Sequence, residues 1–94
     1  MTTSEAAVTI RDAVDAMDVA VVAAGVNKQN GDIETVLSEK GSILDQCCLI
    51  ASWIRRKAED LHTPPDTTEQ IEAAIVSNIL ISLRGDRDTE VWQL

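Results

Sequence analysis

The chain has 94 residues, of which 45% are hydrophobic and 26% charged. This composition predicts a single globular domain over residues 1–94 and excludes a disordered chain. Its sixteen acidic residues outnumber eight basic ones and leave a formal charge of −8, so we expect no direct binding to nucleic acid and no adsorption to an anionic membrane.

The first element is expected near residues 4–24 as a helix, with Ser4 as its N-cap and Gly25 as its stop. Apolar residues recur at helical spacing along it, although the valines of 18–26 also favour a strand, which is the competing interpretation. We keep the helix, because no Phe or Tyr is present and a core of Val, Ile, Leu and Ala packs well through closely spaced helices.

The second helix is expected over residues 32–61, after a turn at 27–31 (NKQNG), with Asp32 as its cap. A continuous apolar face favours one kinked helix through Gly41. The pair Lys40-Gly41 resembles a helix stop and Ser42 with Asp45 resembles a capping box, which favours a break. Both interpretations stay open. The face comprises Ile33, Val36, Leu37, Ile43, Leu44, Cys47, Ala51, Ile54, Ala58 and Leu61.

The third helix is expected over residues 67–84, because Pro64 and Pro65 end the second. Asp66 or Thr67 would cap it, with Glu69 or Gln70 in the reciprocal position, and Gly85 would close it. The tail 86–94 is then either a free end or a strap docked on the fold. The expected fold class is all-α: a small acidic bundle of three to four helices.

The segment Ile71 to Leu83 is apolar almost all the way round a helix, and so short a chain covers both of its sides with difficulty. We therefore expect a homo-oligomer or a partner protein. The predicted oligomer interface contains two polar side chains, which either fix the register of facing helices or occupy a small polar pocket. Its residues are Ile75, Asn78, Ile79 and Ser82.

A second apolar site is expected on the other side of the second helix, where Leu49 and Trp53 are spaced i and i+4 beside Arg56 and Lys57. A large aromatic ring with cationic neighbours is typical of a protein interface. Packing inside the same subunit is the alternative.

Asp12, Asp15 and Asp18 recur every three residues, and this acidic ridge either joins the partner-binding surface or is simply solvated.

Arg55, Arg56 and Lys57 form the only basic cluster in an otherwise acidic chain. At a subunit interface they would hold a small anionic ligand such as a nucleotide. The commoner explanation is that they occupy a helix end and pair with Glu59 or Asp60. The acidic residues match only fragments of a magnesium-dependent hydrolase pattern, and we predict no metal and no cofactor.

Catalysis is not expected. His62 is the sole histidine and lies in a proline-rich turn without a nucleophile nearby. Cys47 is expected on the core face and Cys48 at its edge, as small apolar side chains of a reduced, cytoplasmic protein. No apolar run reaches the roughly 20 residues of a membrane span, and the first residues lack the pattern of a signal peptide.

The sequence therefore predicts a non-enzymatic binding protein that occupies a surface of a larger protein. Inhibitors, adaptors, antitoxins and phage-encoded anti-defence proteins act in this way. The analogy is with these functional classes and not with a particular family. The alternative is a homo-oligomer that binds a small anionic ligand between subunits.

Overall fold

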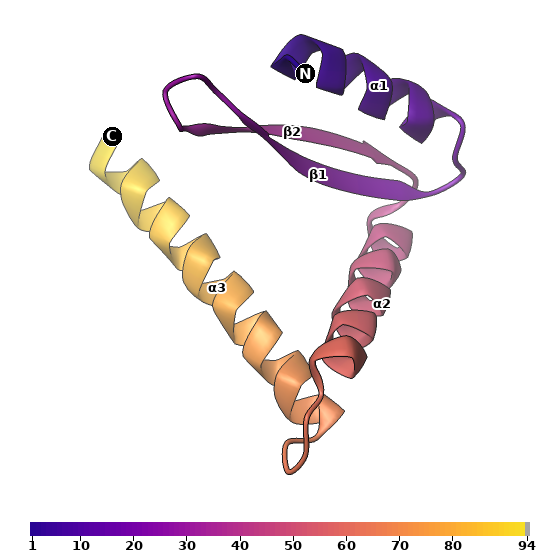
Figure 1. The fold of residues 1–94 in the computed structure, drawn as a ribbon, viewed down its shortest axis with the longest axis vertical. Coiled ribbons are helices and arrows are strands. Elements are labelled where there is room, and N and C mark those ends of the chain that lie inside the picture. Colours follow the sequence, from indigo (N-terminus) through magenta and orange to yellow (C-terminus); the bar gives the residue numbers. More distant parts are fainter. Residues whose placement is uncertain (94) are drawn as a thin grey trace. The chain divides into compact units, whose positions relative to one another are not determined.

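The computed structural model describes residues 1–93, and the side chains only as far as residue 85. In chain order the elements are α1 (Thr3–Asp15), β1 (Ala20–Asn27), β2 (Ile33–Lys40), α2 (Ile43–Leu61) and α3 (Thr68–Gln93) (Figure 1). Residues Met1–Ile50 form one compact unit and Ala51–Leu94 a second. The expectation of a single domain stays a prediction.

The predicted all-α bundle is wrong, because residues 20–40 form an antiparallel hairpin and the chain is α+β. The first expected helix ends at Asp15 instead of continuing to residue 24. The second expected helix, over 32–61, is β2 followed by the shorter α2. The valine-rich segment thus takes the extended conformation that β-branched residues favour.

Hydrogen bonds from side chains hold both ends of helix α1. Thr2 is the N-cap, two residues before the expected Ser4, and its hydroxyl accepts a hydrogen bond from the Glu5 backbone N–H at 3.1 Å. At the other end, the Lys40 ammonium donates to the Asp15 carbonyl at 2.9 Å. This bond satisfies one of the carbonyls that a helix end leaves free and ties α1 to the end of β2.

The hairpin turn fixes the register of the two strands. The Lys28 N–H donates to the Asp32 carbonyl at 2.8 Å, and the Gly31 N–H donates to the Lys28 carbonyl at 3.0 Å. Gly31 has a φ of +87°, the left-handed conformation that ends this kind of three-residue loop. Beyond the turn the pairing runs without interruption from Asn27 opposite Ile33 to Ala20 opposite Lys40.

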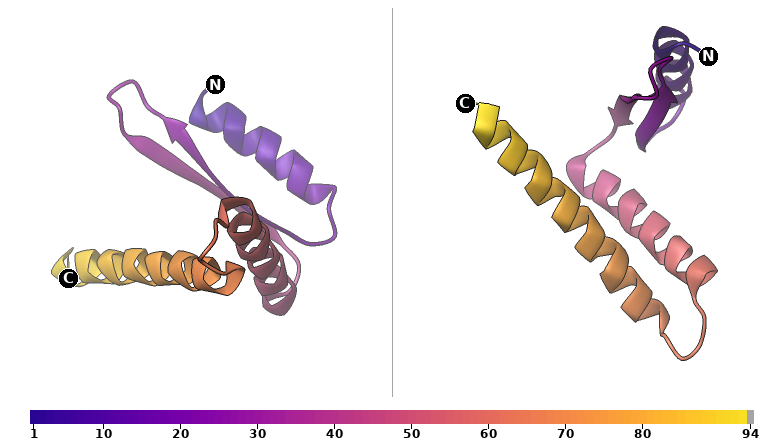
Figure 2. Two further views of the ribbon diagram at one scale, coloured as in Figure 1. Left: turned by 60° about the horizontal axis from the view of Figure 1, so that its bottom comes forward. Right: turned by 60° about the vertical axis from the view of Figure 1, so that its left-hand side comes forward.

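Only one face of the hairpin is covered. Alternate residues of β1, beginning at Ala20, are withdrawn from solvent, and so is Val36 of β2. Helix α1 lies along this face in each view and contributes Ala6 and Val14 to the small core (Figures 1 and 2). The opposite face stays exposed, including Val21, Ile33 and Leu37.

A break at Gly41 separates β2 from α2. Gly41 has a φ of +97°, and the Ser42 hydroxyl accepts from the Asp45 N–H at 3.2 Å as an N-cap. The buried Gln46 side chain donates to the Gly41 carbonyl at 3.0 Å. Of the two interpretations left open, the structure has the break, with Ser42 capping α2 as its spacing to Asp45 indicates. The pair Lys40-Gly41 ends a strand and not the helix that was expected there.

In the second unit, α3 follows the C-terminal part of α2 through a proline-containing loop (Figure 2). Thr67 and Gln70 form a reciprocal capping box: the Gln70 N–H donates to the Thr67 hydroxyl at 3.2 Å, and the Thr67 N–H to the Gln70 amide oxygen at 2.8 Å. Ala58 of α2 is fully buried, and Ile71 and Ile75 of α3 are half-buried.

Helix α3 does not stop at Gly85 as predicted but continues to Gln93. The tail expected over 86–94 is therefore helical through 93. The expected docking of that tail depends on side chains outside the described residues.

Candidate functional site

Helix α3 exposes several large apolar side chains. We call Val76, Ile79, Leu80, Ile81 and Leu83 the α3 apolar surface; their exposed fractions run from 42% for Val76 to 62% for Ile81. Ile71 and Ile75, nearer the start of α3, are partly covered. The segment predicted to be apolar on all sides is a helix, and most of its apolar side chains meet solvent.

Two polar side chains lie among these residues, and both bond to their own helix. The Asn78 amide donates to the Ala74 carbonyl at 3.0 Å, and the Ser82 hydroxyl donates to the Asn78 carbonyl at 3.1 Å. Both residues are exposed. The Ser82 donor is thus satisfied before any other molecule approaches, whereas Asn78 still has a second N–H and an amide oxygen that are left to water.

The second predicted site lies on α2, where Trp53 is 56% exposed and Leu49 is also exposed. Arg56, three residues after Trp53 on the same helix, forms an ion pair with Asp60 at 3.4 Å. Lys57 is exposed. An open indole beside a charged pair has the composition of an interface anchor with a polar rim.

The predicted acidic ridge does not form. Asp12 and Asp15 lie on α1, but the helix ends at Asp15 and Asp18 falls in the bend before β1. The spacing of three residues therefore places only two of the carboxylates on a common helix. Asp12 also lies 3.8 Å from the Arg11 side chain.

The basic cluster Arg55, Arg56 and Lys57 lies on α2 with all three residues exposed. The pairing of Arg56 with Asp60 agrees with the commoner explanation of the cluster, in which the charges are balanced along the helix. The anionic-ligand role stays a prediction.

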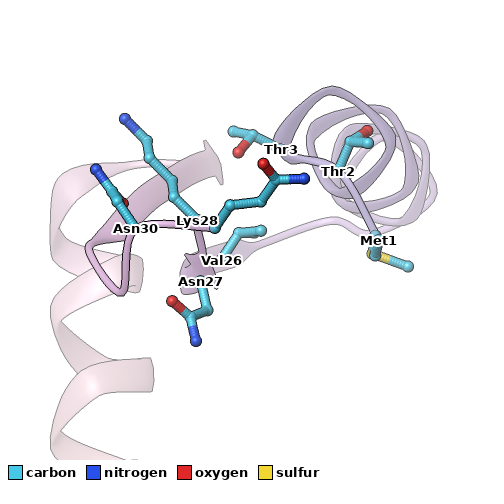
Figure 3. Close-up of a pocket in the computed structure, with 8 residues that line it drawn as sticks. Met1, Thr2, Thr3, Val26, Asn27, Lys28 and Asn30 are labelled. Atoms are coloured by element: carbon cyan, nitrogen blue, oxygen red, sulfur yellow. The ribbon is translucent and has the colours of Figure 1, made fainter.

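A hollow of about 590 Å³ lies between the start of α1 and the hairpin loop (Figure 3). Two of its lining residues, Thr3 and Lys28, are engaged with Glu34 of β2: the Glu34 carboxylate accepts from the Thr3 hydroxyl at 3.2 Å and pairs with the Lys28 ammonium at 3.4 Å. These contacts join the first turn of α1 to the hairpin, so we interpret the cluster as a structural link.

The histidine and the two cysteines, for which no catalytic role is predicted, are all exposed. His62 is exposed in the loop before α3. Cys47 and Cys48 are exposed, so their predicted places on the core face and at its edge are wrong. The apolar face of α2 is covered only farther along the helix, at Ile54 and Ala58. Among residues with described side chains, no three His, Cys, Asp or Glu residues gather as metal ligands would.

Sequence reasoning missed the exposed face of the hairpin. Val21 and Leu37 line a hollow of about 170 Å³ on it. The Asn30-Gly31 pair between two apolar stretches was the available signal, since this dipeptide is typical of a hairpin turn.

Comparison of the chain with protein-family models, with curated proteins and with solved structures finds no match. Within the described residues, none of the helices combines the length and the apolar character needed to cross a membrane.

Proposed function

We propose that this protein acts by binding, without catalysis, and that its second unit occupies a surface of a larger protein, as small inhibitors and adaptors do. One observation carries the proposal. The α3 apolar surface exposes five large aliphatic side chains on one helix, and a neighbouring protein surface offers a matching apolar environment.

The polar residues in the middle of the segment limit which part of α3 is covered cheaply. The Ser82 hydroxyl already donates to the Asn78 carbonyl, and one N–H of Asn78 donates to the Ala74 carbonyl. A partner therefore gains the apolar contact at lowest cost if the other N–H and the amide oxygen of Asn78 stay in contact with water. Trp53, with the Arg56–Asp60 pair beside it, adds an aromatic anchor with a charged edge on α2.

The charge of the chain defines the partner's chemistry. With a formal charge of −8, the protein is attracted to a surface with a basic rim, and this attraction speeds the encounter. We therefore assign the α3 apolar surface to a partner that presents an apolar groove bordered by Lys and Arg.

Quantitative capture from extracts of the native cell tests the proposal, with the tagged full-length chain as bait. We expect the same partner to be captured by the wild type and lost with Leu80→Asp and with Ile79→Asp. Val8→Asp is the matched control, because Val8 is 47% exposed on α1 and Leu80 44% exposed on α3. Circular dichroism checks that each variant keeps its helices.

The decisive measurement is titration calorimetry with the purified partner. Trp53→Ala should weaken binding by about 2 kcal/mol or more if the indole is an anchor. Affinity that is unchanged in all the α3 variants, or no captured protein that responds to them, contradicts the proposal.

A further inference from the structure

The outer edge of β1 is an unpaired strand edge. Within residues 1–93 the sheet contains β1 and β2 alone, so each strand has one side without a neighbour. The Lys28 N–H to Asp32 carbonyl bond fixes which residues point inward, because bonded and non-bonded pairs alternate along an antiparallel ladder. Val21, Ala23 and Gly25 consequently direct their backbone N–H and C=O groups outward.

This edge lacks the features by which proteins block unwanted strand pairing. The eight residues of β1 (AVVAAGVN) include no charge and no proline, and the continuous register leaves no bulge. The strand β2 differs, since it carries Glu34, Glu39 and Lys40. A two-stranded hairpin is also only marginally stable in water, so a further strand would stabilise it.

We propose that β1 pairs with β1 of a second copy of this chain, in antiparallel orientation, with Ala23 on the two-fold axis. Such a contact uses the same patch on both copies and closes as a dimer. The proposal concerns the first unit and is independent of the partner assigned to α3.

Charge selects this register among those that the backbone allows. With Ala23 opposite Ala23 of the other copy, Val21 lies opposite Gly25, and all of these residues have outward-pointing backbone groups. The same register brings Asp18, in the bend two residues before β1, toward Lys28, one residue after β1, at both ends of the contact. The Lys28 ammonium also pairs with Glu34 of its own chain at 3.4 Å. Shifting the axis to Gly25 would instead bring Asp18 against Asp32, where like charges repel.

The resulting sheet has four strands in the order β2, β1, β1, β2. A two-fold axis perpendicular to the sheet keeps both α1 helices on one face. Val21 and Leu37 of the two copies then form a continuous apolar area on the other face, where each is exposed in the single chain. An acidic chain thus associates through an uncharged strand with opposite charges at its ends.

The first test is the molar mass of the full chain by light scattering, from micromolar to millimolar concentration. We expect a dimer for the wild type and a monomer for Ala23→Pro, because proline removes the outward N–H without touching the β1–β2 ladder. Thr35→Pro, at the equivalent outward position of β2, is the control and should stay dimeric. A monomeric wild type, or a dimeric Ala23→Pro variant, overturns the proposal.

The second test does not depend on any variant folding. Amide hydrogen exchange of the wild type should show protection at Ala23 and Gly25 that increases with protein concentration, while Thr35 and Leu37 on the outer edge of β2 stay unprotected. Equal exchange at both edges at every concentration overturns the proposal.

The register has its own test. Asp18→Lys and Asp12→Lys change the net charge by the same amount, and Asp12 is an exposed residue of α1, outside the proposed contact. We expect Asp18→Lys to raise the dimer dissociation constant several-fold at low salt and Asp12→Lys to leave it unchanged or lower it. An equal effect of the two substitutions overturns this register.

Discussion

At the scale of single residues, Gly41 and Gly31 share a left-handed backbone but differ in their surroundings. Gly41 has a φ of +97°, and a Cβ placed on it would lie 3.2 Å from the Val19 side chain. Gly31 has a φ of +87° and open space around it. The two positions therefore separate the conformational cost of a side chain from its steric cost.

Gly31→Ala should lower the free energy of unfolding by about 1–2 kcal/mol, the cost of a left-handed conformation with a Cβ. Gly41→Ala should cost more, because the new methyl group also crowds Val19. Urea unfolding followed by circular dichroism measures both. Equal losses would show that the contact between Gly41 and Val19 is not tight.

The helix caps could be predicted from residues close together in the sequence, whereas the end of a helix could not be predicted from a single glycine. Ser42 with Asp45 and Thr67 with Gln70 form caps as their spacing indicates, because a capping bond joins residues three apart and needs nothing else. Gly85 was wrongly expected to end a helix. A glycine marks a helix end only if the chain adopts a different conformation there, and α3 continues.

Gly85→Ala should therefore stabilise α3 by about 0.5–1 kcal/mol, since alanine loses less backbone entropy in a helix interior. A Cβ at Gly85 meets nothing within 4 Å, so no steric cost opposes the gain. The helical signal and the unfolding midpoint should both rise. A fall in either would place the end of the helix at this glycine.

At the scale of elements, the hairpin shows why an apolar pattern can indicate the wrong period. Ile33, Val36 and Leu37 fit one face of a helix, but in β2 the side chain of Val36 is buried and those of Ile33 and Leu37 are exposed on the other face. A short aliphatic segment fits both periods. Pairing with β1 decides between them, and that pairing lies outside any local window.

The capping box of α3 gives a test at this scale. Thr67→Ala should cost about 1 kcal/mol of stability, because the Gln70 N–H loses its acceptor. Gln70→Ala should cost less, and the double variant should lose less than the sum of the two, since the bonds are reciprocal. Thr67→Ser, which keeps the hydroxyl, is the control. Strict additivity measured by urea unfolding would contradict the reciprocal cap.

At the scale of the whole molecule, little apolar surface is buried relative to what is exposed. The buried apolar residues are small and few, namely Ala6, Val14, Ala20, Val36 and Ala58, whereas large aliphatic side chains are exposed in both units. Association, at α3 or at β1, is the physical means of covering such surfaces. The sequence predicted the exposed surface of α3 because helical geometry alone implies it.

The acidic ridge could not be predicted in the same way. Asp12 and Asp15 belong to a helix and Asp18 does not, and the point where α1 ends depends on contacts with β2, such as the Lys40 bond to Asp15. A surface that lies within one helix can be predicted correctly even if another part of the fold is predicted wrongly. A surface whose residues cross the end of a helix is predicted correctly only if that end is.

Thermal unfolding should depend on protein concentration. Because a dimer dissociates on unfolding, the wild-type Tm should rise by several degrees over a hundredfold increase in concentration. The Tm of Ala23→Pro should stay constant over the same range. Differential scanning calorimetry measures both, and a wild-type Tm that is independent of concentration would argue against any stable self-association.

The hydrogen bonds that Asn78 and Ser82 make to their own helix bear on the selectivity of α3. A buried polar group that needs a partner's hydrogen bond admits few alignments of two surfaces, whereas the Ser82 hydroxyl, already bonded within its helix, imposes no such requirement. Asn78 has one N–H bonded to its own helix, so a partner that covered it would have to pair with the other N–H and the amide oxygen. Helix α3 therefore accepts apolar grooves of differing sequence, provided that Asn78 stays at the edge of the contact and in water.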